Sequence, residues 1–132
     1  MPAQAEELRK IVHGRAAEAA ALCELGDEAR ALLDPAATST AFLDLLRARG
    51  LRHDAVRFLA QLLPAREGVW WACVCARATL PHDAPPSVLA AQEAAQAWVY
   101  QPVDANRRTA FERAQATDFR ASSSWAAMAA FW

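Results

Sequence analysis

Cysteine and histidine are the residue types in this chain that could bind a metal ion or act as a nucleophile and base. Cys73 and Cys75 are two residues apart on a predicted helix, so their side chains point about 200° apart and cannot chelate a metal ion or form a disulfide together. Cys23 is remote from this pair, and an odd number of cysteines in apolar company is typical of reduced, buried thiols. We therefore expect no metal site and no cofactor.

The histidines and carboxylates offer one possible acid/base site. His53 and Asp54 are adjacent on a predicted helix, where neighbouring side chains do not face each other. Glu67 is the one carboxylate on an otherwise apolar helix, so we expect it to be partly buried. The chain has only isolated glycines and therefore no glycine-rich phosphate or oxyanion loop. We expect no catalytic residue, and we keep an enzyme using His53, Asp54 and Glu67 as an alternative.

Trp70 and Trp71 form the strongest signal outside these groups. Adjacent side chains on a helix point about 100° apart, so one narrow apolar stripe cannot bury both. Either the helix is buried nearly all round, or one tryptophan is available to a partner. Five tryptophans are many for 132 residues, and Trp125 or Trp132 is expected to be partly exposed as well.

Helical periodicity, prolines and glycines define the elements that carry these residues. Helices are predicted over residues 5–25, 28–33, 41–49, 53–63, 64–79, 88–100, 104–116 and 122–132. Gly26 and Gly50 are predicted C-caps, and residues 38–40, Ser87 and residues 122–124 are predicted N-caps. No segment alternates with period two, so we expect an all-α fold: a compact bundle of six to seven helices built from antiparallel helical hairpins.

The expected domain organisation is a single helical domain over residues 1–132. It has an N-terminal helical arm, about residues 1–37, and a core, residues 38–132. The helix after Pro64 carries few charges, so we expect it at the centre of the bundle, covered on several sides. The sequence ends at Trp132 on an apolar helical turn, and we expect the native chain to continue beyond it.

Composition and charge exclude several classes of partner. The formal net charge is −1, which gives no field to hold phosphate backbones or anionic lipid. Acidic residues interleave with the arginines of residues 104–120, as on a solvated helix face, so we expect no nucleic-acid partner. There is no run of 18 apolar residues and no signal peptide, so we expect a cytoplasmic protein with no membrane partner.

The segments 54–60 and 63–73 resemble a family of uncharacterised bacterial all-helical proteins whose hallmark is the stretch DAVxFLAxxLPxREAVWWAC. Gly68 stands where that stretch has alanine, and residues 124–132 are similar to the family's C-terminal block. The resemblance covers residues 42–132. It implies an association with type VI secretion gene clusters and thus an accessory, adaptor or chaperone-like role.

We therefore predict a cytoplasmic, non-enzymatic protein–protein interaction module whose partner is a secretion-system component or effector. A helix or strand of the partner would dock in an apolar groove. The predicted groove is lined by Trp70 or Trp71 together with Phe58 and Trp98, and it is rimmed by Arg57, Arg66, Glu67 and Arg77. Besides the enzyme, a structural homodimer is the other alternative.

Overall fold

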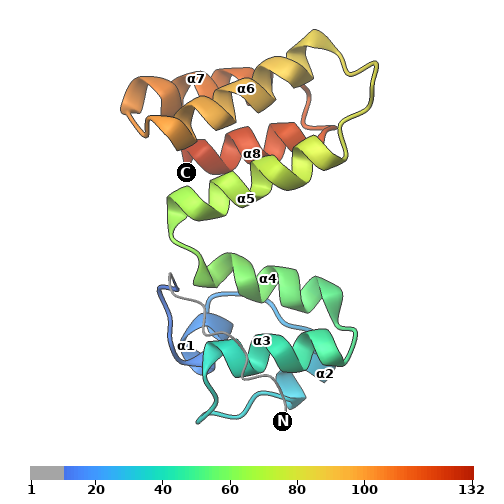
Figure 1. Cartoon of the computed structure of the whole chain (residues 1–132), viewed down its shortest axis with the longest axis vertical. Coiled ribbons are helices and arrows are strands. Elements are labelled where there is room, and N and C mark those ends of the chain that lie inside the picture. The colour runs from blue at the N-terminus through green and yellow to red at the C-terminus, as the bar shows by residue number, and fades with distance from the viewer. Residues whose placement is uncertain (1–10) are drawn as a thin grey trace, which may run out of the picture. The chain divides into compact units, whose positions relative to one another are not determined.

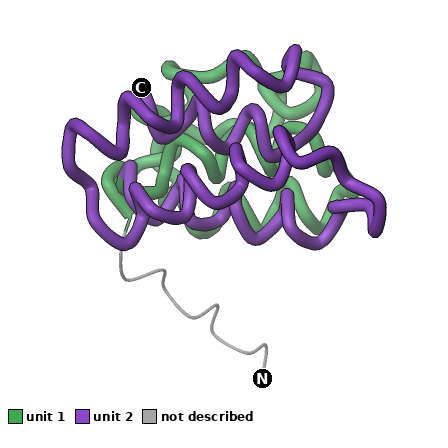
Figure 2. The backbone as a smooth tube through the Cα atoms, turned by 90° about the horizontal axis from the view of Figure 1, so that it is seen from above, with its two compact units in different colours: residues 1–64 green, residues 65–132 purple. Residues whose placement is uncertain are grey.

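The computed structural model describes residues 11–132, and over that range the protein is all-helical, which confirms the predicted fold class (Figure 1). The helices are α1 (Ala16–Ala20), α2 (Asp27–Ala31), α3 (Ser39–Ala48), α4 (Arg52–Leu62), α5 (Ala65–Ala78), α6 (Pro86–Tyr100), α7 (Asp104–Gln115) and α8 (Ser122–Phe131). The chain divides into two compact units, residues 1–64 and 65–132 (Figure 2). The division falls at Pro64, between α4 and α5.

Of the predicted N-terminal helix over residues 5–25, the described part of the chain is helical only at α1. Residues 1–10 lie outside the described part of the chain, residues 11–14 are not helical, and α1 has only five residues. The reason is tertiary: Val12 N–H donates to the Leu62 carbonyl at 2.9 Å, and the Gly14 carbonyl accepts from Ser39 N–H at 2.9 Å. Main-chain groups bonded to distant residues cannot also form helical bonds.

Gly26 was expected to end this helix, and it instead precedes α2 as its N-cap residue. Its N–H donates to the Asp54 Oδ1 atom at 2.8 Å, so the start of α2 is bonded to α4. The helix that follows, predicted over residues 28–33, is found at Asp27–Ala31.

The core of unit 1 (residues 1–64) is built on the hairpin of α3 and α4, which pack against each other and against α1. Thr38 caps α3 through its Oγ1 atom, which accepts from Ala41 N–H at 3.2 Å, and Gly50 follows α3 with a left-handed φ of 70°. Phe42 and Phe58 meet edge to face in the core, with ring centroids 4.9 Å apart. The residues that fill this core are Ala16, Ala19, Leu25, Ala29, Phe42, Leu43, Leu46, Ala55, Phe58 and Leu62.

Unit 2 (residues 65–132) contains four helices, and α8 packs against α5, α6 and α7 (Figure 1). Alanine dominates its core, which lets the helices approach closely. The buried alanines are Ala91, Ala94, Ala95, Ala110, Ala114, Ala126, Ala127 and Ala130. Helix α6 starts at Pro86, inside the segment expected to be a loop, because proline is tolerated in the first turn of a helix.

The three serines at the start of α8 were expected to cap it, but Ala121 is the N-cap residue. Ser123 and Ser124 are buried instead. Ser123 Oγ donates to Gln92 Oε1 at 2.8 Å, and Gln92 Nε2 donates to the Cys73 carbonyl at 3.0 Å. Gln92 therefore links α5, α6 and α8 inside unit 2. Within residues 11–132, no buried side-chain nitrogen or oxygen lacks a hydrogen-bond partner.

None of the helices in residues 11–132 has both the length and the apolar character that a membrane-spanning helix needs.

Candidate interaction surfaces

Helix α5 is not covered on several sides, contrary to the expectation from its apolar sequence. It buries Val69, Cys73 and Ala76, which follow each other at helical spacing along one face. The residues next to that stripe are exposed: Trp70 is 57 % exposed and Val74 is 45 % exposed. One face of α5 packs in unit 2, and a neighbouring face presents a large aromatic side chain to solvent.

The structure distinguishes the two adjacent tryptophans. Trp70 is exposed, whereas Trp71 is partly buried. This confirms that one apolar stripe does not bury both rings, and it identifies Trp70 as the accessible one.

Arg66 holds the end of α6 beside the start of α5. Its Nε donates to the Val99 carbonyl at 2.6 Å and its Nη2 to the Tyr100 carbonyl at 3.2 Å. The last carbonyls of a helix have no partner within the helix, and a cation is favoured there. Arg66 was expected on the rim of a groove, but its guanidinium instead caps α6. This fixes Tyr100, which is 81 % exposed, near α5.

A small notch of about 60 Å³ lies between α5 and α6. It is lined by Trp70, Cys73, Val74, Arg77, Gln96, Val99 and Tyr100. Pockets for small molecules usually measure about 300–1,000 Å³, so this notch is far too small for a substrate and suits one small side chain. We call the surface formed by Trp70, Val74, Arg77, Gln96 and Tyr100 the Trp70 face.

The other predicted groove residues have different surroundings. The prediction for Phe58 is wrong, because its ring is fully buried in the core of unit 1. Arg57 donates from Nη1 to the Glu24 carbonyl at 3.2 Å, within the same unit.

Trp98 is partly buried against the core of unit 2 and does not line the notch. Glu67 is partly buried. Of the eight predicted residues, Trp70 and Arg77 thus share the Trp70 face.

The groups that could support acid/base chemistry are engaged or exposed. Asp54 accepts the Gly26 N–H, and His53 is exposed on α4. In the part of the chain that the structure describes, no three His, Cys, Asp or Glu residues are grouped so that they could hold a metal ion. Burial raises the pKa of the Cys73 thiol, against a smaller lowering by Arg77.

The arginines at the start of α7 share a carboxylate. Asp104 accepts from Arg107 Nη2 at 2.8 Å and from Arg108 Nε at 2.7 Å, and the hydrogen bond from Arg107 lowers the pKa of Asp104. Arg107 also stacks over the Phe131 ring, 4.7 Å from its centroid. Arginines and a carboxylate thus pair with each other on the surface of α7.

Trp125 on α8 is 60 % exposed, with its ring 5.3 Å from that of Phe119.

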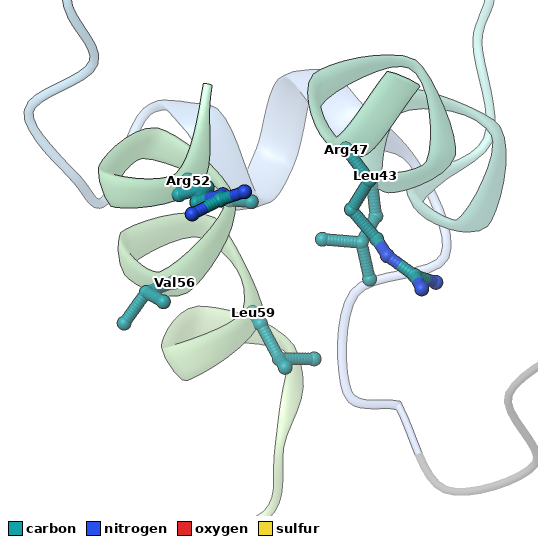
Figure 3. Close-up of a pocket in the computed structure, with 6 residues that line it drawn as sticks. Leu43, Arg47, Arg52, Val56 and Leu59 are labelled. Atoms are coloured by element: carbon teal, nitrogen blue, oxygen red, sulfur yellow. The ribbon is translucent and has the colours of Figure 1, made fainter. Parts of the chain in front are cut away.

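Unit 1 carries a larger concavity that the sequence analysis missed. A groove of about 580 Å³ lies between α3 and α4 (Figure 3). It is lined by Leu43, Arg47, Arg52, Ala55, Val56 and Leu59. The available signal was the width of the apolar face of α4: Ala55, Phe58 and Leu62 fill the core, which leaves Val56 exposed and Leu59 only partly buried at the edge of that core.

Comparison with known proteins gives one finding on relatedness. The model of a protein family described as "Family of unknown function (DUF6931)" matches residues 42–132, from α3 to the end of α8. No curated protein and no solved structure matches the chain. The match covers the Trp70 face and the groove between α3 and α4, and it agrees with the expected membership in an uncharacterised family.

Proposed function

Because the chain belongs to the DUF6931 family, whose function is unknown, we propose its role from its surfaces: it is a protein–protein interaction module that binds a partner through the Trp70 face. The observation that carries this proposal is the exposure of Trp70. Trp, Tyr and Arg are the residue types that most often dominate binding energy at protein interfaces, and the Trp70 face contains one of each.

The shape of the Trp70 face favours a helix as the bound element. The face runs along α5 and reaches the end of α6, so it is a shallow strip with a small notch. A helix of the partner that carries a small side chain opposite the notch could lie along this strip, with its larger apolar side chains against Trp70 and Val74. Arg77 and Gln96 would form the polar rim that interfaces commonly have.

The biological setting extends this proposal. The resemblance of residues 54–73 to a family associated with type VI secretion supports an accessory, adaptor or chaperone-like protein of a bacterial secretion system. The partner would then be a secretion-system component or an effector, met in the cytoplasm. The proposed chemistry is binding without catalysis: Tyr100 and the buried Cys73 are the residues lining the notch that could act as acid, base or nucleophile, and no carboxylate or histidine lines the notch with them.

Trp70→Ala tests the proposal, and Trp125→Ala is the matched control. Both tryptophans are more than half exposed in unit 2, but Trp125 lies outside the Trp70 face. Tagged wild-type protein is purified from the native host, and its partner is identified by mass spectrometry and titrated by calorimetry. Loss of a dominant tryptophan is worth about 2 kcal/mol or more, so we expect Trp70→Ala to weaken binding roughly 30-fold.

We expect the Trp125→Ala protein to bind like wild type and both variants to keep the wild-type circular dichroism. Equal affinity of Trp70→Ala and wild type for the partner would contradict the proposal. Light scattering tests the homodimer alternative: a dimer in wild type that becomes a monomer in Trp70→Ala would make the partner a second copy of this chain.

A further inference from the structure

The groove between α3 and α4, which we call the hairpin groove, is chemically different from the Trp70 face. We infer that it is a second binding site, which takes an acidic amphipathic helix of a partner protein. All of its lining residues belong to unit 1, so this inference does not depend on the Trp70 face. Variants in the two units can therefore fail or succeed separately.

The floor of the hairpin groove is apolar, and Val56 and Leu59 leave part of it in contact with solvent. Leu43 on α3 and Leu59 on α4 project into the space between the helices (Figure 3). Val56 is 52 % exposed, which is unusual for a residue on the long apolar face of α4. Leu43 and Ala55 also belong to the core of unit 1, so the floor is the outer edge of that core, and Val56 is its exposed apolar side chain. If a partner covered this floor, apolar surface would be removed from water, which is favourable by about 25 cal/mol for each Å² buried.

The charge of the groove is concentrated at one end. Helices α3 and α4 are joined by the short turn at Gly50, so Arg47, near the end of α3, and Arg52, at the start of α4, both lie at the turn. Among residues 11–132, no carboxylate lies within ion-pair distance of Arg52. Arg47 reaches Asp44 only at 3.8 Å, longer than a charge-assisted hydrogen bond of about 2.8 Å, and its side chain is largely exposed.

The helix dipoles do not add to this charge, because the negative end of α3 and the positive end of α4 lie at the same turn. No carboxylate or other acidic group lines the groove. The hairpin groove is thus an apolar trough with two guanidinium groups at its turn end and leucine and valine along the remainder.

These features define the occupant by its chemistry. Aspartate or glutamate would pair with Arg47 and Arg52, and apolar side chains spaced i, i+4 and i+7 would cover Leu43, Val56 and Leu59. The lining residues of α4 run from Arg52 to Leu59, about 10 Å at 1.5 Å per residue, so two to three turns of helix would fill the groove.

The test begins with selection of random 16-residue peptides, displayed on phage, against the full-length protein. We expect enriched peptides to share apolar residues at helical spacing and a cluster of aspartate or glutamate at one end. A labelled enriched peptide is then titrated by fluorescence anisotropy. We expect Val56→Glu, and the double variant Arg47→Glu with Arg52→Glu, each to weaken binding at least tenfold. The double variant should regain binding to a peptide whose acidic residues are changed to lysine.

Arg49→Glu is the matched control, because Arg49 is exposed at the same turn but does not line the groove. It should bind the peptide like wild type, as should Trp70→Ala. No enriched peptides, enriched peptides without acidic residues, or equal binding by Val56→Glu would each overturn the inference. A wild-type dimer that Val56→Glu makes monomeric would overturn it too, because a second copy of the chain would then cover the groove.

Discussion

Trp70 and Trp71 show how much one position along a helix changes the surroundings of a side chain. The 100° between them places Trp70 in solvent and leaves Trp71 partly buried. The sequence predicted that a single stripe could not bury both rings. It could not predict which one is exposed, because that depends on where α6 ends beside α5. The position of this end is held by Arg66 through two main-chain carbonyls.

Several arginines act through main-chain carbonyls rather than through carboxylates. Arg30, Arg57, Arg66 and Arg107 each donate to a main-chain carbonyl that is at least five residues away. Such bonds leave no signature in sequence spacing, whereas i,i+3 pairs such as Asp44 with Arg47 do. The sequence therefore assigned Arg57 and Arg66 to the rim of a groove, where the structure gives them a role in holding the fold.

The three cysteines should differ in their rate of alkylation. Thiolate is the reactive form, so a raised pKa lowers the reactive fraction at a given pH. Burial raises the pKa of Cys73, and burial together with Asp54 raises that of Cys23, partly opposed by Arg57. Cys75 is exposed. With iodoacetamide at pH 8, peptide mapping by mass spectrometry should show Cys75 modified first and Cys73 last.

Raising the pH should increase the rates for Cys23 and Cys73, because their thiols ionise at higher pH than an ordinary thiol. Urea should remove the differences among the three sites by unfolding the chain. Modification of Cys73 before Cys75 in the folded protein would contradict this order.

At the scale of helices, the sequence predicted α3 to α8 to within two residues at each end. Local signals were sufficient there: apolar residues at 3/4 spacing, breaking residues between helices and a capping threonine at the start of α3. The N-terminal segment has the same periodicity, yet residues 11–14 are not helical, because their main-chain groups bond to α4 and to the start of α3. Periodicity cannot reveal such a competing partner.

The serines of α8 were also misinterpreted for a physical reason. A serine run before an apolar segment is a typical N-cap signal, but Ser123 is a hydrogen-bond partner of buried Gln92. Gln92 lies on an Ala-rich helix and carries no sequence signal of burial. The polar contact among α5, α6 and α8 could therefore be found only from the structure.

This contact should show strong coupling between Gln92 and Ser123. In Gln92→Leu, Ser123 Oγ loses its buried acceptor, so we expect the free energy of unfolding to fall by about 1–3 kcal/mol. The double variant with Ser123→Ala removes both polar groups, and it should be less destabilised than the sum of the single variants by about 0.5 kcal/mol or more. Urea denaturation followed by circular dichroism measures all four proteins. Strict additivity would show that the two side chains do not interact.

At the scale of the whole molecule, residues 11–132 form two hydrophobic cores that share no residue. One is formed by residues of unit 1 and the other by residues of unit 2. The sequence placed a hinge at Pro64, but periodicity and caps define helices without showing which helices share a core. For the same reason the hairpin groove was missed, since it depends on which face of α4 the core occupies.

Phe42→Ala should destabilise unit 1 selectively. Phe42 is buried against Phe58, and removal of a buried phenylalanine ring usually lowers stability by about 3–5 kcal/mol. Hydrogen exchange with mass spectrometry should show faster exchange in α3 and α4, while α6 and α8 keep wild-type protection. Equal acceleration in both units would show that the two cores unfold as one cooperative structure.

The division at Pro64 also separates the chromophores of the chain. All five tryptophans and the single tyrosine lie in residues 65–132, and the aromatic side chains of residues 1–64 are phenylalanines. Absorbance at 280 nm and intrinsic emission excited at 295 nm therefore arise from unit 2, whereas far-ultraviolet dichroism records the helices of both units. In a thermal scan followed by both signals, tryptophan emission therefore reports the unfolding of unit 2 and far-ultraviolet dichroism reports that of both units, without a label.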